Sequence, residues 1–115
     1  MWRNIRDPGL LEAYRAEAAA RPGYEAIAHM LEALASYDID GLFAVTSLGV
    51  LRLTTAPTWL AEDRHPSVDV VARKGSYVVS FASPGARRSA SSTECDGGTL
   101  LSTVEMHVLR LFREH

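Results

Sequence analysis

At 115 residues, with 47% hydrophobic and 23% charged residues, the chain has the size and composition of one ordinary globular domain. Its formal net charge is −2 and both signs are spread along the sequence, so it lacks the basic surface expected of a nucleic-acid binder. Its apolar runs are shorter than the roughly 20 residues that span a bilayer. We therefore expect no nucleic-acid partner and no membrane partner.

Cysteine usage and the first residues favour a reducing compartment. Cys95 is the one cysteine, which excludes an intrachain disulfide. The first eight residues lack the apolar core of a secretory signal. Both features predict a cytoplasmic location. Lys74 is the one lysine, all the other residues counted as Lys or Arg are arginines, and alanine is abundant. This composition suggests a GC-rich bacterial genome.

The first third of the chain predicts two helices. Asp7 and Pro8 form a good helix start, with Asp7 as the N-cap and the φ angle of Pro8 already set. Apolar side chains then recur at helical spacing until residues 21–23, Arg-Pro-Gly, end the helix. A second helix begins near Tyr24 and stops by Tyr37, where turn residues follow. The two helices are expected to form a hairpin that packs on a sheet.

The middle of the chain predicts a sheet. Short segments rich in β-branched and aromatic residues are separated by turns, and a fifth segment reads either as an edge strand or as a loop. The four clear segments are 42–46, 50–55, 68–73 and 77–82, and the fifth is 88–93. Gaps this short join antiparallel neighbours, because a parallel crossover needs a dozen or more residues. A last helix opens near Asp96 or Thr99 and runs to the C-terminus.

The predicted fold class is α+β, with all 115 residues in one domain. It comprises two N-terminal helices, an antiparallel meander of four or five strands and a C-terminal helix, with all three helices packed on one face of the sheet. Alternation along the strands assigns the core face to Phe43, Val45, Leu51, Leu53, Val68, Val70, Tyr77, Val79 and Phe81. It assigns the opposite face to Ala44, Thr46, Arg52, Thr54, Asp69, Val71, Arg73, Val78 and Ser80.

The uncovered side of this sheet is the first candidate for a partner site. Arg52, Asp69 and Arg73 could be a solvated cluster of ion pairs with little energetic value. Alternatively, Val71 and Val78 form an apolar centre inside that charged rim, which is how protein interfaces are built.

Two further segments could contribute to a partner site. Residues 87–94, which include Arg87 and Arg88, have almost no apolar face, and such a segment either protects a sheet edge or offers it to an extended peptide. Trp59 lies in the longest irregular segment. It either fills the end of the core or serves as an exposed anchor at an interface, where tryptophan is enriched.

Candidates for catalysis or ligand binding are weak. Cys95 stands near a helix start, but acidic neighbours oppose thiolate formation and the spacing nominates no base. Gly97-Gly98-Thr99 could bind an anion, yet it lacks the P-loop lysine and spacing. The trio of Glu25, His29 and Glu32 on one helix face could ligate a metal but is typical of a solvated surface. We expect no catalytic residue, cofactor or metal.

These observations favour a small non-enzymatic protein-binding module of the bacterial cytoplasm. An immunity protein, an inhibitor or an adaptor would fit, acting through the open sheet face or the polar edge strand. The alternative is a small-molecule binding protein or an enzyme, with a pocket between sheet and helices into which Tyr14, Tyr24, Tyr37 and Tyr77 place hydroxyls. A homodimer that pairs open faces or edge strands is a third hypothesis.

Overall fold

The computed structural model describes residues 2–37, 39–47, 49–58, 61, 64–83 and 91–113. These residues form an α+β fold of six strands and three helices. The class is as predicted from the sequence, and so is the order of the elements that follow the first strand. The elements are β1 (Trp2–Asn4), α1 (Pro8–Ala18), α2 (Tyr24–Ser36), β2 (Phe43–Ser47), β3 (Val50–Thr54), β4 (Ser67–Arg73), β5 (Ser76–Ala82), β6 (Ser91–Cys95) and α3 (Leu100–Arg113).

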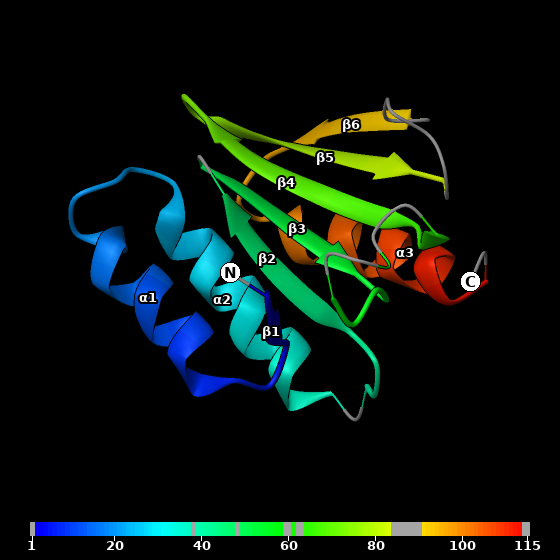
Figure 1. The fold of residues 1–115 in the computed structure, drawn as a ribbon. Coiled ribbons are helices and arrows are strands. Elements are labelled where there is room, and N and C mark those ends of the chain that lie inside the picture. The colour runs from blue at the N-terminus through cyan, green and yellow to red at the C-terminus, as the bar shows by residue number, and fades with distance from the viewer. Residues whose placement is uncertain are drawn as a thin grey trace.

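The sheet is a meander in which the strands lie in chain order and each neighbouring pair is antiparallel (Figure 1). The predicted antiparallel meander is confirmed, but four or five strands was too low a count. The additional strand is β1, which pairs with β2 so that Arg3 lies opposite Ala44. Three residues are too few for alternation to reveal a strand in a sequence. The last strand covers Ser91–Cys95 instead of 88–93, and residues 88–90 lie outside the described part.

Local chemistry explains where the first two helices begin. At the start of α1, the backbone N–H of Gly9 donates to the Asp7 carboxylate at 2.9 Å, and Pro8 occupies the first helical turn. Gly23 precedes α2 with a φ of +94°, a conformation that L side chains rarely adopt. The Tyr77 hydroxyl donates to the Gly23 carbonyl oxygen at 2.6 Å. This bond fixes the α1–α2 turn to β5.

The helices α2 and α3 pack against each other and lie on the same side of the sheet (Figure 1). The helix α1 makes its main contacts with α2 and lies beside it (Figure 1). The expectation that all three helices pack on one sheet face therefore holds for α2 and α3 but not for α1, whose buried residues Leu10 and Tyr14 complete the core from the side of α2.

The core fills the layer between the sheet and the two helices. Its sheet wall includes Val70, Val79 and Phe81, all of which are fully buried. Full burial of each large apolar side chain contributes roughly 1.5–3 kcal/mol, so this layer is the main source of stability. The helices supply Ile27, Met30, Leu31, Leu34, Leu100, Val104, Val108 and Leu111.

The predicted faces are correct for β3, β4 and β5 and wrong for β2. Ala44 pairs with Leu53 and is fully buried, whereas Val45 pairs with Arg52 and is only half-buried. Phe43 is likewise half-buried on the side of Val45. The reason is that Leu42, just before the strand, is buried on the same side as Ala44. Apolar residues therefore occupy both alternating sets, and the set with the larger side chains, Phe43 and Val45, is not the buried one.

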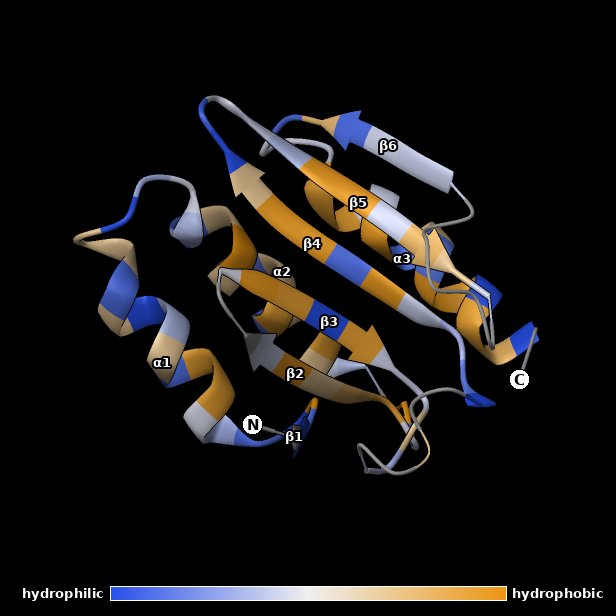
Figure 2. Ribbon diagram, turned by 45° about the horizontal axis from the view of Figure 1, so that its top comes forward, coloured by the Kyte–Doolittle hydropathy of each residue, from blue (hydrophilic) through white to orange (hydrophobic). Residues whose placement is uncertain are grey.

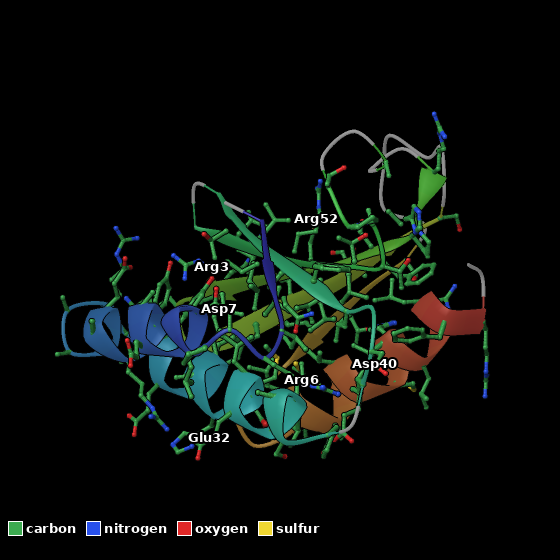
Figure 3. The ribbon with its side chains drawn as sticks, turned by 60° about the horizontal axis from the view of Figure 1, so that its bottom comes forward. Arg3, Arg6, Asp7, Glu32, Asp40 and Arg52 are labelled. Atoms are coloured by element: carbon green, nitrogen blue, oxygen red, sulfur yellow. The ribbon has the colours of Figure 1, made fainter. Side chains whose placement is uncertain are left out.

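Ion pairs connect the N-terminal segment to its neighbours (Figure 3). Arg3 pairs with Asp7 at 3.3 Å, which joins β1 to the cap of α1. Arg6 pairs with Asp40 at 3.4 Å, which joins the β1–α1 turn to the turn before β2. The Arg6–Asp40 contact is exposed and the Arg3–Asp7 contact is half-buried, and surface pairs of this kind stabilise by at most about 1 kcal/mol each. The buried Ile5, whose N–H donates to the Leu42 carbonyl oxygen, is the stronger attachment.

Candidate functional site

The sheet face opposite α2 and α3 is covered by none of the described helices, and Figure 2 looks onto it. We call it the open face. Cross-strand register brings its side chains into rows that run across the sheet. One row holds Val45, Arg52, Asp69, Ser80 and Ser92, and the next holds Val50, Val71, Val78 and Glu94.

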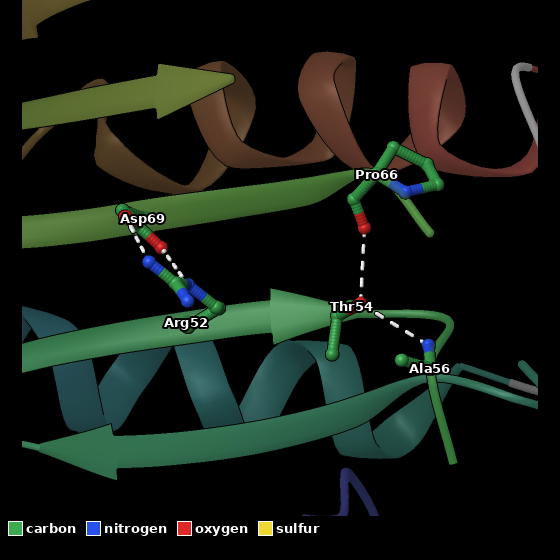
Figure 4. Close-up of polar contacts among 5 residues, drawn as sticks. All are labelled: Arg52, Thr54, Ala56, Pro66 and Asp69. Atoms are coloured by element: carbon green, nitrogen blue, oxygen red, sulfur yellow. Dashed lines mark hydrogen bonds and ion pairs between the residues drawn. The ribbon is translucent and has the colours of Figure 1, made fainter. Parts of the chain in front are cut away.

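Arg52 and Asp69 meet at the centre of the open face, as the sequence suggested (Figure 4). The guanidinium Nε donates to one carboxylate oxygen at 2.8 Å and Nη2 donates to the other at 3.1 Å. This bidentate geometry orients both side chains and is stronger than a single exposed contact. Both side chains are half-buried and hydrogen-bonded to each other. Their charged groups are therefore held in one orientation at the surface of the sheet.

Val71 and Val78 also meet, because they are direct partners across β4 and β5. Val50 lies opposite Val71 on the other side, so three valines form an uninterrupted apolar row. All three are half-buried, and none of the described helices covers Val71 or Val78. Sequence reasoning missed Val50, as well as Val45 in the neighbouring row. Alternation along β3 from Arg52 was an available signal for Val50, whereas Val45 required the register of β2 against β3.

Charged residues border one end of the valine row. Arg73, which the sequence placed in the candidate site, is exposed at the end of β4, and Lys74 follows it in the turn. Glu94 is exposed on β6 beside Val78. Within the described residues, neither Arg73 nor Lys74 forms an ion pair. The open face thus has an apolar row with two cations and one carboxylate at its border.

The opposite end of the open face is closed by the segment that follows β3. Thr54 is fully buried although it belongs to the open side, and its hydroxyl is satisfied by donating to the Pro66 carbonyl oxygen at 3.0 Å (Figure 4). The Thr54 hydroxyl oxygen in turn accepts from the Ala56 N–H at 3.1 Å. Thr55 and His65 are joined by a second bond of 2.9 Å. The accessible part of the open face is therefore the part nearer the β4–β5 turn.

Three residues of the predicted partner site lie outside the described part of the chain. They are Trp59, Arg87 and Arg88. Their assignment to a partner site stays a prediction.

A second exposed apolar surface lies on α3 and was not predicted. Met106, Leu109 and Phe112 follow one another at three-residue spacing and are 56%, 60% and 41% exposed. We call them the outer stripe of α3. Met106 and Leu109 were not singled out from the sequence, although their spacing of three was an available signal. Phe112 is exposed, whereas the preceding residue, Leu111, is fully buried in the core.

A cleft of about 390 Å³ opens between the end of α1, the start of α2 and the β2–β3 hairpin. Its described walls are Ala13, Tyr14, Glu17, Arg21, Tyr24, Thr46, Gly49 and Val50. We call it the tyrosine cleft. Its volume lies at the small end of the range for ligand pockets.

Only two of the four tyrosines expected in a common pocket reach this cleft. Tyr14 and Tyr24 line it, with ring centroids 5.3 Å apart. The Tyr77 hydroxyl is bonded to Gly23 instead, and the Tyr37 hydroxyl donates to Glu105 at 3.2 Å. Burial raises the pKa of Tyr14, and the neighbouring Tyr24 and Glu17 raise it further. The Tyr14 phenol therefore stays protonated and is a hydrogen-bond donor at neutral pH.

The residues weighed for other chemistry are dispersed or have structural roles. Asp96 accepts from the Thr99 N–H at 2.9 Å, which is capping chemistry before α3. Glu32 pairs with Arg15 at 2.6 Å, away from the exposed Glu25–His29 contact of 4.0 Å. Among the residues that the structure describes, no group of three or more metal-ligating side chains occurs. Cys95 is half-buried at the end of β6.

His107 is the one buried group with unmet hydrogen-bonding capacity among the described side chains. It is 4% exposed, and neither ring nitrogen has a hydrogen-bond partner. Its ring stacks on Phe81 with centroids 6.3 Å apart. Burial lowers the pKa of His107, and the positive charge of Arg110 lowers it further. The imidazole is therefore neutral and acts as part of the core.

None of the described helices is both long enough and apolar enough to cross a bilayer. Comparison with protein-family models, with curated proteins and with solved structures finds no match to this chain.

Proposed function

We propose that this chain is a small protein-binding module of the bacterial cytoplasm, of the immunity-protein, inhibitor or adaptor type, and that it binds its partner through the open face. The observation that carries the proposal is the row of Val50, Val71 and Val78, which is half-buried on a sheet face without a helical cover in the described structure. An apolar centre with polar groups around it is the usual construction of a protein interface.

The fixed Arg52–Asp69 pair supports the same proposal. It adds a rigid polar contact beside the valine row, and preorganised groups lose little conformational freedom when a partner binds. Arg73 and Lys74 add positive charge at the accessible end. The partner that this surface fits is a folded protein with an apolar patch bordered by carboxylates, because such a patch would complement both the valines and the two cations.

A paired substitution tests the face without removing cross-strand complementarity. Val71→Lys with Val78→Glu places opposite charges directly opposite each other, and this favourable pair offsets the like charge of Glu94 on the other side of position 78. The tagged wild-type chain first recovers its partner from the native host, and the partner is identified and purified. Its affinity for the variant is then measured. We expect a loss of at least tenfold, which corresponds to about 1.4 kcal/mol.

The matched control is Leu109→Lys on α3, which places a charge at a similarly apolar but distant exposed position. It should leave the affinity for the partner unchanged. Circular dichroism and thermal melting of each variant establish that the fold is retained. Undiminished binding by a folded Val71→Lys/Val78→Glu protein would dismiss the open face. If only Leu109→Lys weakens binding, the partner uses the outer stripe of α3 instead.

Self-association is the other way in which the open face could be covered. Two copies that pair open faces would bury the same valines. Light scattering at increasing protein concentration distinguishes the cases. A monomer at all concentrations excludes the homodimer, whereas a dimer that the Val71→Lys/Val78→Glu change dissociates would identify the second copy as the partner.

A further inference from the structure

The tyrosine cleft combines an aromatic wall with two opposite charges. Tyr14 and Tyr24 stand side by side, and their planes are tilted by 36°. Tyr14 is 7% exposed, and its hydroxyl makes no hydrogen bond to any described residue. Because that hydroxyl is not enclosed by protein, it can donate to a molecule in the cleft.

The charges stand one helical turn apart at the rim. Arg21 Nε lies 3.2 Å from a Glu17 carboxylate oxygen, and the Arg21 guanidinium carbon lies 5.6 Å from the centre of the Tyr24 ring. Both charged side chains are more than half exposed, so their mutual attraction is weak and solvent already competes with it. A bound molecule with a carboxylate and an ammonium group could replace the Arg21–Glu17 contact with two ion pairs, one between its carboxylate and Arg21 and one between its ammonium and Glu17.

The opposite wall allows close approach. Gly49, in the β2–β3 turn, has a φ of +81° and no described heavy atom within 4 Å of where a Cβ would stand. Val50 beside it supplies an apolar surface. A planar ring can therefore enter between the hairpin and the tyrosines, where offset or edge-to-face contacts with aromatic rings are favourable.

We propose that the tyrosine cleft binds a small aromatic zwitterion of the aromatic amino acid class. The ring lies against Tyr14 and Tyr24, the carboxylate is held by Arg21 and the ammonium by Glu17. This site is separate from the proposed protein-binding function, although Val50 borders both. The cleft volume of about 390 Å³ suits a ligand of one or two rings and is too small for a dinucleotide.

The chemistry discriminates this class from its neighbours. A simple cation is disfavoured because Arg21 already places a positive charge at the rim of the cleft. An aliphatic zwitterion would keep both charge contacts but lose the aromatic contact. An aromatic acid or an aromatic amine would keep the ring contact and leave one rim charge without a new partner.

Calorimetry and NMR titration of the intact protein test this with defined probes. The probes are L-phenylalanine, L-tyrosine and L-tryptophan, compared with L-leucine, phenethylamine and 3-phenylpropionate. We expect at least one aromatic amino acid to bind at least fivefold more tightly than leucine and than both single-charge analogues. The amide resonances of Gly49 and Val50 should shift on binding.

Two substitutions locate the site. Arg21→Gln should weaken the best probe about fivefold or more, whereas Arg15→Gln, which changes an exposed arginine of α1 outside the cleft walls, should not. Tyr14→Phe keeps the ring and the packing but removes the donor, and we expect about a threefold loss. The variant Leu109→Lys on α3 is a control distant from the cleft, and its affinity for the best probe should equal that of the wild type.

Three results would overturn the proposal. One is the absence of binding by every aromatic amino acid at concentrations up to about 10 mM. Another is equal binding of leucine, which would remove the aromatic preference. The third is loss of binding in Arg15→Gln but not in Arg21→Gln, which would place the ligand elsewhere. None of these results bears on the open face, whose test uses Val71 and Val78.

Discussion

The two faces of the sheet are built from neighbouring residues of the same strands, yet they differ in how tightly each side chain is specified. On the covered face, Val79 and Phe81 are fully buried against helices. On the open face, Val78 and Ser80, from the same strand, are half-buried. The covered face must be filled to native packing density, which leaves little freedom of size or shape.

The open face carries no such demand for volume, so its composition is free to serve another purpose. Even so, it keeps a row of valines and a bidentate Arg52–Asp69 pair. Stability alone would be served by polar β-formers such as threonine at these positions. The residues of the covered face are therefore determined by the packing of the fold, whereas the residues of the open face can be selected for binding to a partner.

The comparison is tested most strongly at Phe81. Phe81→Ala creates a cavity under α3 and removes the contact with Arg110, whose guanidinium carbon lies 3.9 Å from the ring centre. We expect a loss of about 3–5 kcal/mol in the free energy of unfolding, measured by urea denaturation. Ser80→Ala, the adjacent residue on the open face, should change it by less than about 0.5 kcal/mol. Equal losses at the two positions would contradict the assignment of the faces.

An intermediate effect is expected from His107, the polar group within the covered layer. Because burial lowers its pKa, the folded protein resists a proton that the unfolded chain accepts below the ordinary value of about 6.5. Above pH 6.5, the ordinary pKa of histidine, His107 should have no effect on how stability depends on pH. As the pH falls from there to the lower pKa of the folded state, the free energy of unfolding should decrease, and below that pKa the decrease from this group should stop.

The urea midpoint of the wild type and of His107→Leu, compared at pH 7 and pH 5, measures this contribution. The wild type should lose more stability than the variant between the two values. An identical loss in both proteins would show that His107 takes no part in the acid response.

The smallest effect is expected at the polar centre of the open face. Arg52→Ala leaves the half-buried Asp69 without its bidentate partner and should cost about 1 kcal/mol. Replacement of both residues, Arg52→Met with Asp69→Leu, should cost less than the single change, because no unpaired charge remains. A double-mutant cycle from denaturation midpoints measures the coupling. Additive losses would mean that the pair contributes no interaction of its own.

Much of the fold could be predicted because its signals are local. The cap at Asp7, the glycine before α2 and the alternation along β4 and β5 each depend on a few adjacent residues. The errors arose where a long-range partner decides. β1 exists only because β2 pairs with it, and the orientation of β2 depends on which of two apolar sets α2 covers. Periodicity in one segment contains neither fact.

The candidate sites were predictable to different degrees for the same reason. Val71, Val78, Arg52 and Asp69 come together as expected, because adjacent hairpins transmit register over short distances. The tyrosine cleft joins α1, α2 and the β2–β3 hairpin, elements whose relative position is set by tertiary packing. The sequence indicated a shared pocket for tyrosines but did not identify which two of them line it. The outer stripe of α3 was hidden because the richer stripe on the same helix dominated the pattern.

The edge strand β1 has a consequence for how the chain reaches its native state. From β2 onward, every strand finds its partner in the neighbouring stretch of chain, so that portion can assemble by successive short-range steps. β1 instead pairs with β2 across the long segment that contains α1 and α2. Closing this longer loop has a larger entropic cost. We therefore expect the amino-terminal edge to join last during folding and to open first under stress, and amide exchange at Arg3 should outpace exchange at Val79.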